Sequence, residues 1–214
     1  AVRGEECYIF DPRFPDMAPP NMVILPFTRN AVGPVDYTPG GFSDNTYPHL
    51  TTYGFELSLP VILESGILHL ADTPERTLGL PDFAVDFLKE IPVVWDDTRF
   101  LAGYPGKEVV IARRSGTRWY IAGVNGENLS KVIGVDLSDL GEKPVSIELM
   151  VDDRLDTRQE AHLLALVERY GIPILSLHAP FVDRRLLGWG GDVVDIIKRT
   201  VRLTEAVGGQ HVVM

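Results

Sequence analysis

Two residues on neighbouring predicted strands are the first candidates for chemistry. Residues 146–151 and 174–178 are short apolar runs typical of strands, and they contain Glu148 and His178. An imidazole at the open end of a strand can bind zinc or another divalent metal, and Glu148 on the next strand could contact a substrate. A metal site needs three or four ligands, so a hydrogen-bonded histidine without metal is the alternative. His211 begins its own strand, and we assign it a structural role.

A further candidate follows the apolar run at residues 22–25. The run is short and bounded by prolines, so the sequence predicts a buried strand that leads into a polar loop rich in glycine and proline. Such a strand and loop are typical of the working edge of an α/β barrel. Asp36 in the loop could be catalytic, but a carboxylate that caps the turn is the simpler interpretation. Arg29 is interpreted as a partner in a structural ion pair.

Aspartates and tryptophans later in the chain have both a functional and a structural interpretation. Asp96 and Asp97 are predicted to cap a turn. Trp95 and Trp119 could stack on sugar rings, although packing in the core of a small sheet is the commoner use of such side chains. The sequence contains neither a phosphate-binding glycine loop nor a serine nucleophile elbow.

The composition narrows the class of partner. The chain has 214 residues, of which 45% are hydrophobic and 23% charged, and its formal net charge is -10. This negative charge argues against nucleic acid or an anionic membrane as a partner, because both are negatively charged too. It fits a neutral substrate with a bound cation. No apolar run approaches the length of a membrane-spanning helix. The single cysteine, Cys7, excludes an intrachain disulfide.

The elements that would position these residues begin with helices. Apolar residues three or four apart predict a helix over residues 49–68. Pro60 is expected to kink or split this helix, and Gly66 to end it. A second helix is predicted over residues 81–90.

The hydrophobic period changes to two after Pro92. Residues 109–112 and 119–124 are runs of β-branched and aromatic residues separated by a glycine-containing connection, which predicts a β-hairpin. Residues 132–137 are predicted to add a third strand. The expected product is a small antiparallel sheet.

The last third of the chain alternates strands and helices. Thr157 and Glu160 form a capping box that opens a helix after the strand at 146–151. A second helix is predicted over residues 190–208, and a further strand over 211–214. Strands that alternate with helices through short loops predict a parallel sheet.

Long stretches of the first two thirds resemble a known family. They are AVRGEE, LPFTRNAVGPVDYTPGGF, ESGILHLADTPE and VVWDDTRFLAGYPGKEVVIARRSGTRWYIAGVNGE, which cover roughly residues 1–140. They are similar to the end of the catalytic barrel and the start of the C-terminal β domain of glycoside hydrolase family 97, the α-glucosidases and α-galactosidases. The resemblance implies calcium-assisted hydrolysis of a terminal α-glycosidic bond in an oligosaccharide or other sugar substrate, and a periplasmic or secreted location.

Glu6 is the residue to which this resemblance gives a chemical role. The segment VRGEE matches the end of the family motif E-x-V-R-G-x-E, whose second glutamate is the general acid and a calcium ligand. Glycoside hydrolysis generally needs two carboxyl groups, and calcium takes six to eight oxygens. The motif's first glutamate would precede Ala1, so we expect no complete active site in this chain alone. The alternative for Glu6 is a solvated glutamate.

The tail resembles a second family. IELMVDDR, YGIPILSLHAPF and DIIKRTVRLTEAVGGQHVVM are similar to strands two to four of the xylose-isomerase-like TIM barrels, which include sugar phosphate isomerases and epimerases. In the metal-dependent relatives, the histidine that matches His178 binds zinc or lies close to the metal. This resemblance implies a cytoplasmic location.

Together these patterns predict an α/β chain built from fragments of (β/α)8 TIM barrels with a small antiparallel β domain. The expected division is a barrel end at residues 1–91, a truncated β domain at 92–141 and a β-α-β-α-β segment at 142–214. Both chain ends resemble cuts in longer sequences, and a fusion and an assembly artefact remain open. An incomplete barrel would expose unpaired strand edges, which makes self-association possible.

Overall fold

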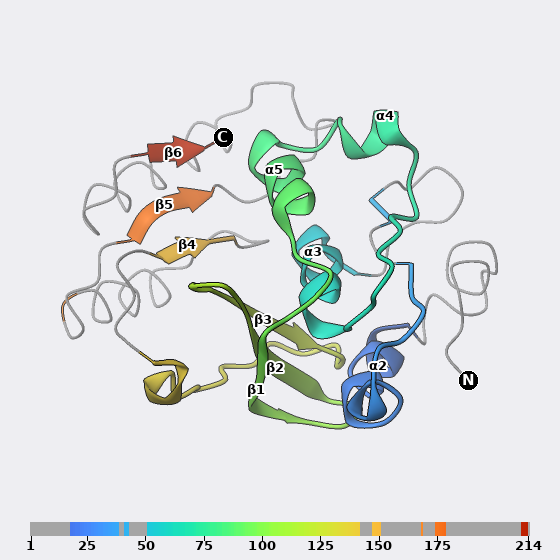
Figure 1. Cartoon of the computed structure of the whole chain (residues 1–214), viewed down its shortest axis with the longest axis vertical. Coiled ribbons are helices and arrows are strands. Elements are labelled where there is room, and N and C mark those ends of the chain that lie inside the picture. Colours follow the sequence, from blue (N-terminus) through green and yellow to red (C-terminus); the bar gives the residue numbers. More distant parts are fainter. Residues whose placement is uncertain are drawn as a thin grey trace. The chain divides into compact units, whose positions relative to one another are not determined.

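The chain divides into two compact units, Ala1–Gly141 and Glu142–Met214 (Figure 1). Each unit has a three-stranded sheet, antiparallel in the first and parallel in the second. The computed structural model describes residues 18–38, 41–42, 51–141, 147–150, 168, 174–178 and 211–213.

The described part of unit 1 contains four short α-helices and three 3-10 turns. The α-helices are α2 (Ala18–Met22), α3 (Tyr53–Ile62), α4 (Pro74–Thr77) and α5 (Asp82–Glu90). The 3-10 turns are η2 (Leu25–Phe27), η3 (Asn30–Val32) and η4 (Ser138–Leu140). The helix predicted over residues 81–90 is confirmed as α5.

The strand predicted at residues 22–25 is wrong, because this stretch runs from the last residue of α2 to the first residue of η2. Its backbone forms local bonds instead of a ladder: the Val23 N–H donates to the Pro19 carbonyl at 3.3 Å, and the Phe27 N–H donates to a carbonyl three residues earlier at 3.1 Å. Pro26 in the first turn of η2 suits a helical turn and could not donate to a sheet. The burial expected of the apolar run is nevertheless present at Val23, which is fully buried.

Helix α3 is shorter than the helix predicted over residues 49–68. The Thr52 side chain caps its N-terminus by accepting a hydrogen bond from a first-turn N–H at 3.2 Å. Pro60 lies inside the helix without ending it. The helix ends at Ile62, before Gly66, and Arg113 from the sheet donates to its last carbonyls.

The antiparallel sheet has the order β1-β2-β3, with β1 (Asp97–Tyr104), β2 (Glu108–Ser115) and β3 (Arg118–Asn125). The predicted hairpin is confirmed as β2 and β3, which pair without any register shift. Sequence reasoning did not find β1, whose residues DTRFLAGY lack clean alternation. A bulge between Phe100 and Ala102 interrupts the β1–β2 pairing and changes which residues face each side.

The strand predicted at residues 132–137 is wrong. The structure assigns no strand there, and the described residues offer this segment no pairing partner. Val132 is fully exposed on one side of the segment, and Val135 and Leu137 are exposed on the other, so neither face is buried as a strand would require. Asp136 instead accepts a hydrogen bond from the Ser138 N–H at 2.9 Å, which turns the chain into η4.

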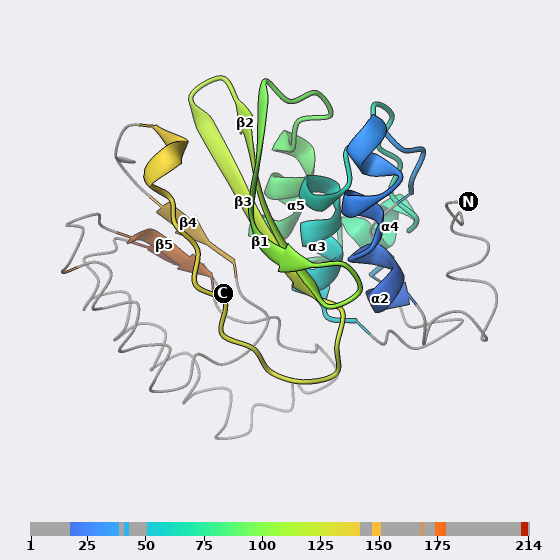
Figure 2. The same ribbon diagram turned by 90° about the horizontal axis from the view of Figure 1, so that it is seen from below.

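The core of unit 1 lies between the sheet and its helices. Figure 2 shows α3 and α5 on the same side of the sheet. Buried side chains from the end of α3 pack with alternate residues of the central strand: Leu59, Ile62, Leu63, Val109 and Ile111. Each such burial is worth about 1.5–3 kcal/mol, so this layer is a main source of stability.

Unit 2 contains a parallel sheet with the order β4-β5-β6. Its strands are β4 (Ile147–Leu149), β5 (Ile174–His178) and β6 (His211–Val213). The three predicted strands of the tail and their parallel arrangement are thereby confirmed. The helices predicted over residues 157–170 and 190–208 lie outside the described residues, apart from residue 168.

Candidate functional site

The residue assigned to glycosidase chemistry, Glu6, lies outside the described residues. Within the described ranges, no group of three or more His, Cys, Asp or Glu side chains could hold a metal ion. The described helices are also all too short, or too polar, to cross a membrane. The calcium site implied by the resemblance therefore remains a prediction.

Glu148 and His178 lie on adjacent strands, as predicted. Glu148 on β4 pairs with Ser176 on β5, and Ser176 pairs in turn with His211 on β6. His178 ends β5 and pairs with Val213. The backbone therefore brings Glu148, Ser176 and His211 into one row across the sheet, with His178 two residues further along.

Asp36 and Arg29 lie in the part of the loop region that the structure describes. Asp36 is exposed. The Arg29 guanidinium donates to the Gly33 carbonyl at 3.4 Å, and among the described residues it makes this backbone contact in place of the predicted ion pair. Asp96 behaves as predicted: its carboxylate accepts a hydrogen bond from the Gly116 N–H at 2.7 Å and caps the β2–β3 turn. Asp97 accepts from the adjacent Thr98 N–H at 2.8 Å.

The two tryptophans differ in their surroundings. Trp95 packs edge-on against Tyr120, with ring centroids 5.3 Å apart, beside the core. This contact agrees with the core-packing interpretation. Trp119 lies under the Arg114 guanidinium, which is 6.0 Å from the ring centroid.

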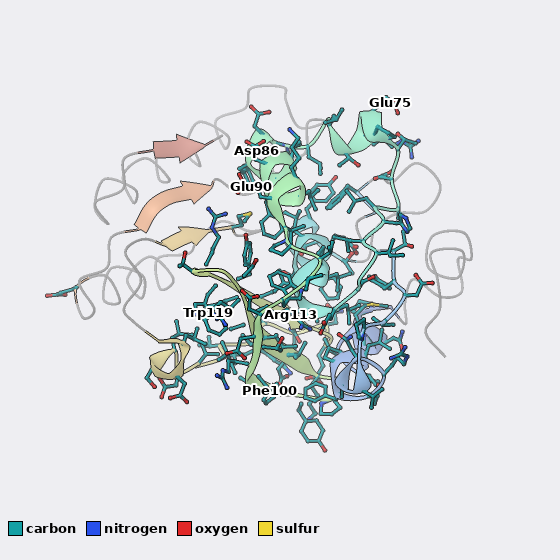
Figure 3. The ribbon with its side chains drawn as sticks, viewed as in Figure 1. Glu75, Asp86, Glu90, Phe100, Arg113 and Trp119 are labelled. Atoms are coloured by element: carbon teal, nitrogen blue, oxygen red, sulfur yellow. The ribbon has the colours of Figure 1, made fainter. Side chains whose placement is uncertain are left out.

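Arg113 is a buried arginine of unit 1 that the sequence analysis did not identify as important. It comes from the central strand β2, and its side chain is buried on the face that packs against α3 (Figure 3). Its Nε donates to the Val61 carbonyl at 2.6 Å, and one terminal nitrogen donates to the Ile62 carbonyl at 3.2 Å. The other terminal nitrogen contacts the Glu64 carboxylate at 3.2 Å and the Thr98 hydroxyl at 2.9 Å.

This arrangement joins the helix to the sheet. The last carbonyls of a helix lack partners within it and carry partial negative charge, so a buried guanidinium satisfies and neutralises them. Burial lowers the pKa of Arg113 from its ordinary value, and the Glu64 carboxylate opposes that shift. An arginine stays charged under these conditions, so Arg113 positions elements and does not transfer protons.

Asn30 holds the same segment from the other side. Its side-chain oxygen accepts from the Glu64 N–H at 2.8 Å, and its amide nitrogen donates to the Glu64 carbonyl at 3.1 Å and to the Gly33 carbonyl at 3.0 Å. The Val35 N–H also donates to the Glu64 carbonyl at 2.8 Å. The backbone of Glu64 is therefore fixed by η3 and the loop that follows it.

Glu56 is a buried carboxylate in the first turn of α3. It is fully buried, and one of its oxygens accepts from the Thr51 hydroxyl at 2.7 Å. The burial of Glu56 could not be predicted from the sequence, because the pattern FELSLPVI is equally compatible with a helix in which Glu56 faces solvent.

Comparison with known proteins indicates the family that this chain is similar to. Residues 94–166 match the family model described as "Glycosyl-hydrolase 97 C-terminal, oligomerisation". A probable retaining α-galactosidase of Streptomyces bingchenggensis is 48% identical over 103 residues, covering 48% of this chain and 16% of the relative. A retaining α-galactosidase of Bacteroides thetaiotaomicron is 36% identical over 140 residues, covering 61% and 21%. The resemblance to glycoside hydrolase family 97 is confirmed.

Two solved structures are similar to parts of this chain. A β-arabinopyranosidase is 36% identical with a TM-score of 0.55, over 57% of this chain and 20% of that chain. A family 97 enzyme from Pseudoalteromonas sp. strain K8, in complex with panose, is 34% identical with a TM-score of 0.44, over 50% and 18%. The chain spans about a fifth of the length of the curated α-galactosidases that it matches. The match to the family 97 C-terminal model continues past Gly141 and includes β4.

Proposed function

We propose that this chain forms the C-terminal part of a retaining family 97 glycosidase that releases terminal α-galactose or α-glucose from oligosaccharides. The observation that carries the proposal is the 48% identity over 103 residues with a probable retaining α-galactosidase. Residues 1–91 would then supply the end of its catalytic barrel, with the β domain after it.

Glu6 is proposed as the general acid and base and as a calcium ligand. In a retaining mechanism, one carboxyl protonates the leaving oxygen and then deprotonates the water that hydrolyses the glycosyl-enzyme intermediate. Calcium bound by carboxylate oxygens would hold Glu6 in place and supply positive charge near it. This assignment rests on the match of VRGEE to the family motif.

The test is hydrolysis of nitrophenyl glycosides by the intact polypeptide that carries this sequence, with calcium and with a chelator. The substrates are the α-galactoside, the α-glucoside and the β-arabinopyranoside, since a similar structure is a β-arabinopyranosidase. Glu6→Gln is expected to lower kcat by about 10²–10⁴-fold. The matched control is Glu5→Gln, which changes the adjacent glutamate and should retain activity.

Azide distinguishes the proposed role of Glu6 from a structural one. An acid/base variant accumulates the glycosyl-enzyme intermediate, which azide can attack without base assistance. We expect azide to restore turnover of Glu6→Gln and to give a glycosyl azide of retained configuration. Loss of activity in Glu6→Gln without azide rescue would reject the acid/base role.

We also infer a role in assembly for residues 94–166, because the matched family model is described as an oligomerisation domain. Self-association of this chain was also expected from its unpaired strand edges. Sedimentation velocity over a range of protein concentrations measures it.

A sugar phosphate isomerase or epimerase is the second candidate, and it rests on unit 2. The parallel β4-β5-β6 sheet supports it, since Glu148 and His178 lie on adjacent strands there. His178 is proposed as a ligand for zinc or another divalent metal. Zinc titration of the chain and its His178→Ala variant tests this, and equal stoichiometry in both would reject it.

A further inference from the structure

The antiparallel sheet of unit 1 has two edges, β1 and β3. Among the described strands, each of them pairs with β2 alone. An edge strand presents unpaired N–H and C=O groups that can pair with another strand, and proteins commonly block this with bulges, charges or prolines. The two edges of this sheet differ in such protection.

The β1 edge is protected. Its bulge between Phe100 and Ala102 breaks the regular spacing of backbone groups, and Gly103 follows in the left-handed region with φ of 137°. Asp97 and Arg99 form an ion pair at 2.9 Å on the same strand. A strand with these features is a poor template for another strand.

The β3 edge has no bulge and no glycine in the left-handed region, although Arg118 at its start forms an ion pair with Glu90 at 3.0 Å. All eight of its residues pair one to one with β2, and its sequence RWYIAGVN contains a single charge, at Arg118. The side chain of Ile121 is 46% exposed, and Gly123 is exposed. Trp119, Ile121 and Gly123 alternate along the face directed away from α3, since Ala122 and Val124 contribute to the core.

We propose that β3 pairs antiparallel with β3 of a second copy of this chain, so that two sheets join into one of six strands. This proposal rests on the assembly role proposed for residues 94–166, which contain all of β3, and it names the surface responsible. A two-fold axis perpendicular to the sheet keeps both α3-covered faces on one side. Residues opposite one another then face the same side of the joined sheet.

One register is favoured by the side chains. With Ile121 opposite Ile121 of the second copy, the two exposed side chains bury each other, and Trp119 lies over Gly123 of the other strand at both ends. Aromatic side chains that cover a strand glycine, and paired β-branched residues, stabilise antiparallel pairs. Arg118 falls opposite Val124, so no like charges meet. A register in which the two-fold axis passes through Ala122 would instead place Ile121 opposite Gly123 of the second copy.

Disulfide trapping tests both the partner and the register. In a Cys7→Ser background, Ile121→Cys places two cysteines directly opposite each other, with Cα atoms about 4.5 or 5.5 Å apart. This separation lies within the range of about 4.4–6.8 Å that a disulfide needs. We expect a covalent dimer on mild oxidation. Val132→Cys is the matched control, since Val132 is fully exposed outside the sheet and should not form one.

Sedimentation gives the second test. Ile121→Lys should raise the dimer dissociation constant at least tenfold, while Val132→Lys, with the same charge change, should not. A wild-type chain that stays monomeric at all concentrations, or a dimer that survives Ile121→Lys, would overturn the proposal. Glu6-dependent hydrolysis by the intact polypeptide is measured separately in Ile121→Lys, so failure of the β3 interface is distinguishable from failure of the glycosidase assignment.

Discussion

The Arg113 side chain, from the middle of the sheet, donates a 2.6 Å hydrogen bond from Nε to the carbonyl of Val61 at the end of α3. The two residues are 52 positions apart in the sequence. The same guanidinium bonds Ile62 and Glu64, so one side chain holds the helix end and the segment after it. Because the region that precedes Pro92 and the β domain meet at this point, Arg113 couples their stability.

Replacement of Arg113 by alanine should therefore be severe. It removes every contact of the guanidinium and leaves the Val61 and Ile62 carbonyls buried without that donor. We expect Arg113→Ala to lower the free energy of unfolding by about 3 kcal/mol, measured by urea denaturation. Arg113→Lys should recover only part of this loss, because an ammonium lacks the planar fork.

The matched control for Arg113 is its neighbour Arg114. The Arg114 side chain lies on the other face of β2, is 34% exposed and pairs with Asp96 at 3.5 Å. Exposed ion pairs contribute little, so Arg114→Ala should cost about 0.5 kcal/mol. Equal losses in Arg113→Ala and Arg114→Ala would contradict the role assigned to Arg113.

Asn30→Asp tests the second attachment of this segment. The carboxylate can still accept from the Glu64 N–H, but it cannot donate to the Glu64 and Gly33 carbonyls and repels both. The expected loss is about 1–2 kcal/mol at neutral pH. The loss should shrink as the pH falls towards the ordinary aspartate pKa of about 3.9 and vanish below it, because a protonated aspartate can donate again. Asn128→Asp, at an exposed position, should show neither effect when thermal unfolding is followed against pH.

The sequence predicted those elements whose apolar residues form a distinct pattern. Helix α5 has a regular helical period, and strands β2, β3 and β5 contain short apolar runs, so each was found close to its observed bounds. Strand β1 was missed because an edge strand with a bulge is specified by its ladder with β2 and not by alternation. The run at residues 22–25 was predicted as buried, correctly, but a four-residue apolar run does not distinguish a strand from a helical turn.

The contacts that organise unit 1 are long-range and could not be predicted from local pattern. Arg113 reads in sequence as a hairpin residue beside Arg114, and only the packing of α3 on β2 shows which of the two is buried. Asn30 and Glu64 are 34 positions apart. Glu6 was assigned by motif alone, and the structure does not describe that part of the chain.

Gly103 should be hard to replace. Its φ of 137° is unfavourable for any residue with a side chain, and a Cβ there would lie 2.3 Å from the Glu108 carbonyl oxygen. Gly103→Ala is expected to lower the free energy of unfolding by about 1–3 kcal/mol, visible as a lower Tm in calorimetry. The control is Gly134→Ala, where no atom lies within 4 Å of the added Cβ. This change should be neutral or stabilising by up to about 1 kcal/mol, because it restricts the unfolded chain.

The ion pairs of Lys131 predict a stability that falls at both low and high pH. Its ammonium bonds the carboxylates of both Glu108 and Glu127. These bonds raise the pKa of Lys131 above its ordinary value, and the bond from Lys131 lowers the pKa of Glu127 below its own. A lowered carboxyl pKa gives stability that is present above the ordinary value of 4.5 and is lost as the pH falls through the folded-state value. A raised ammonium pKa gives stability that is present below 10.5 and is lost as the pH rises through its folded-state value.

The measurement is the Tm of wild type and Lys131→Met from pH 3 to 11. We expect the difference between the two proteins to be largest in the neutral range and to shrink toward both extremes, and high salt should reduce it throughout. Lys89→Met is the control, since Lys89 is 64% exposed and lies 3.6 Å from a single partner, Asp86. A difference between wild type and Lys131→Met that stayed constant across the pH range would mean that Lys131 stabilises the loop through its aliphatic stem and not through its charge.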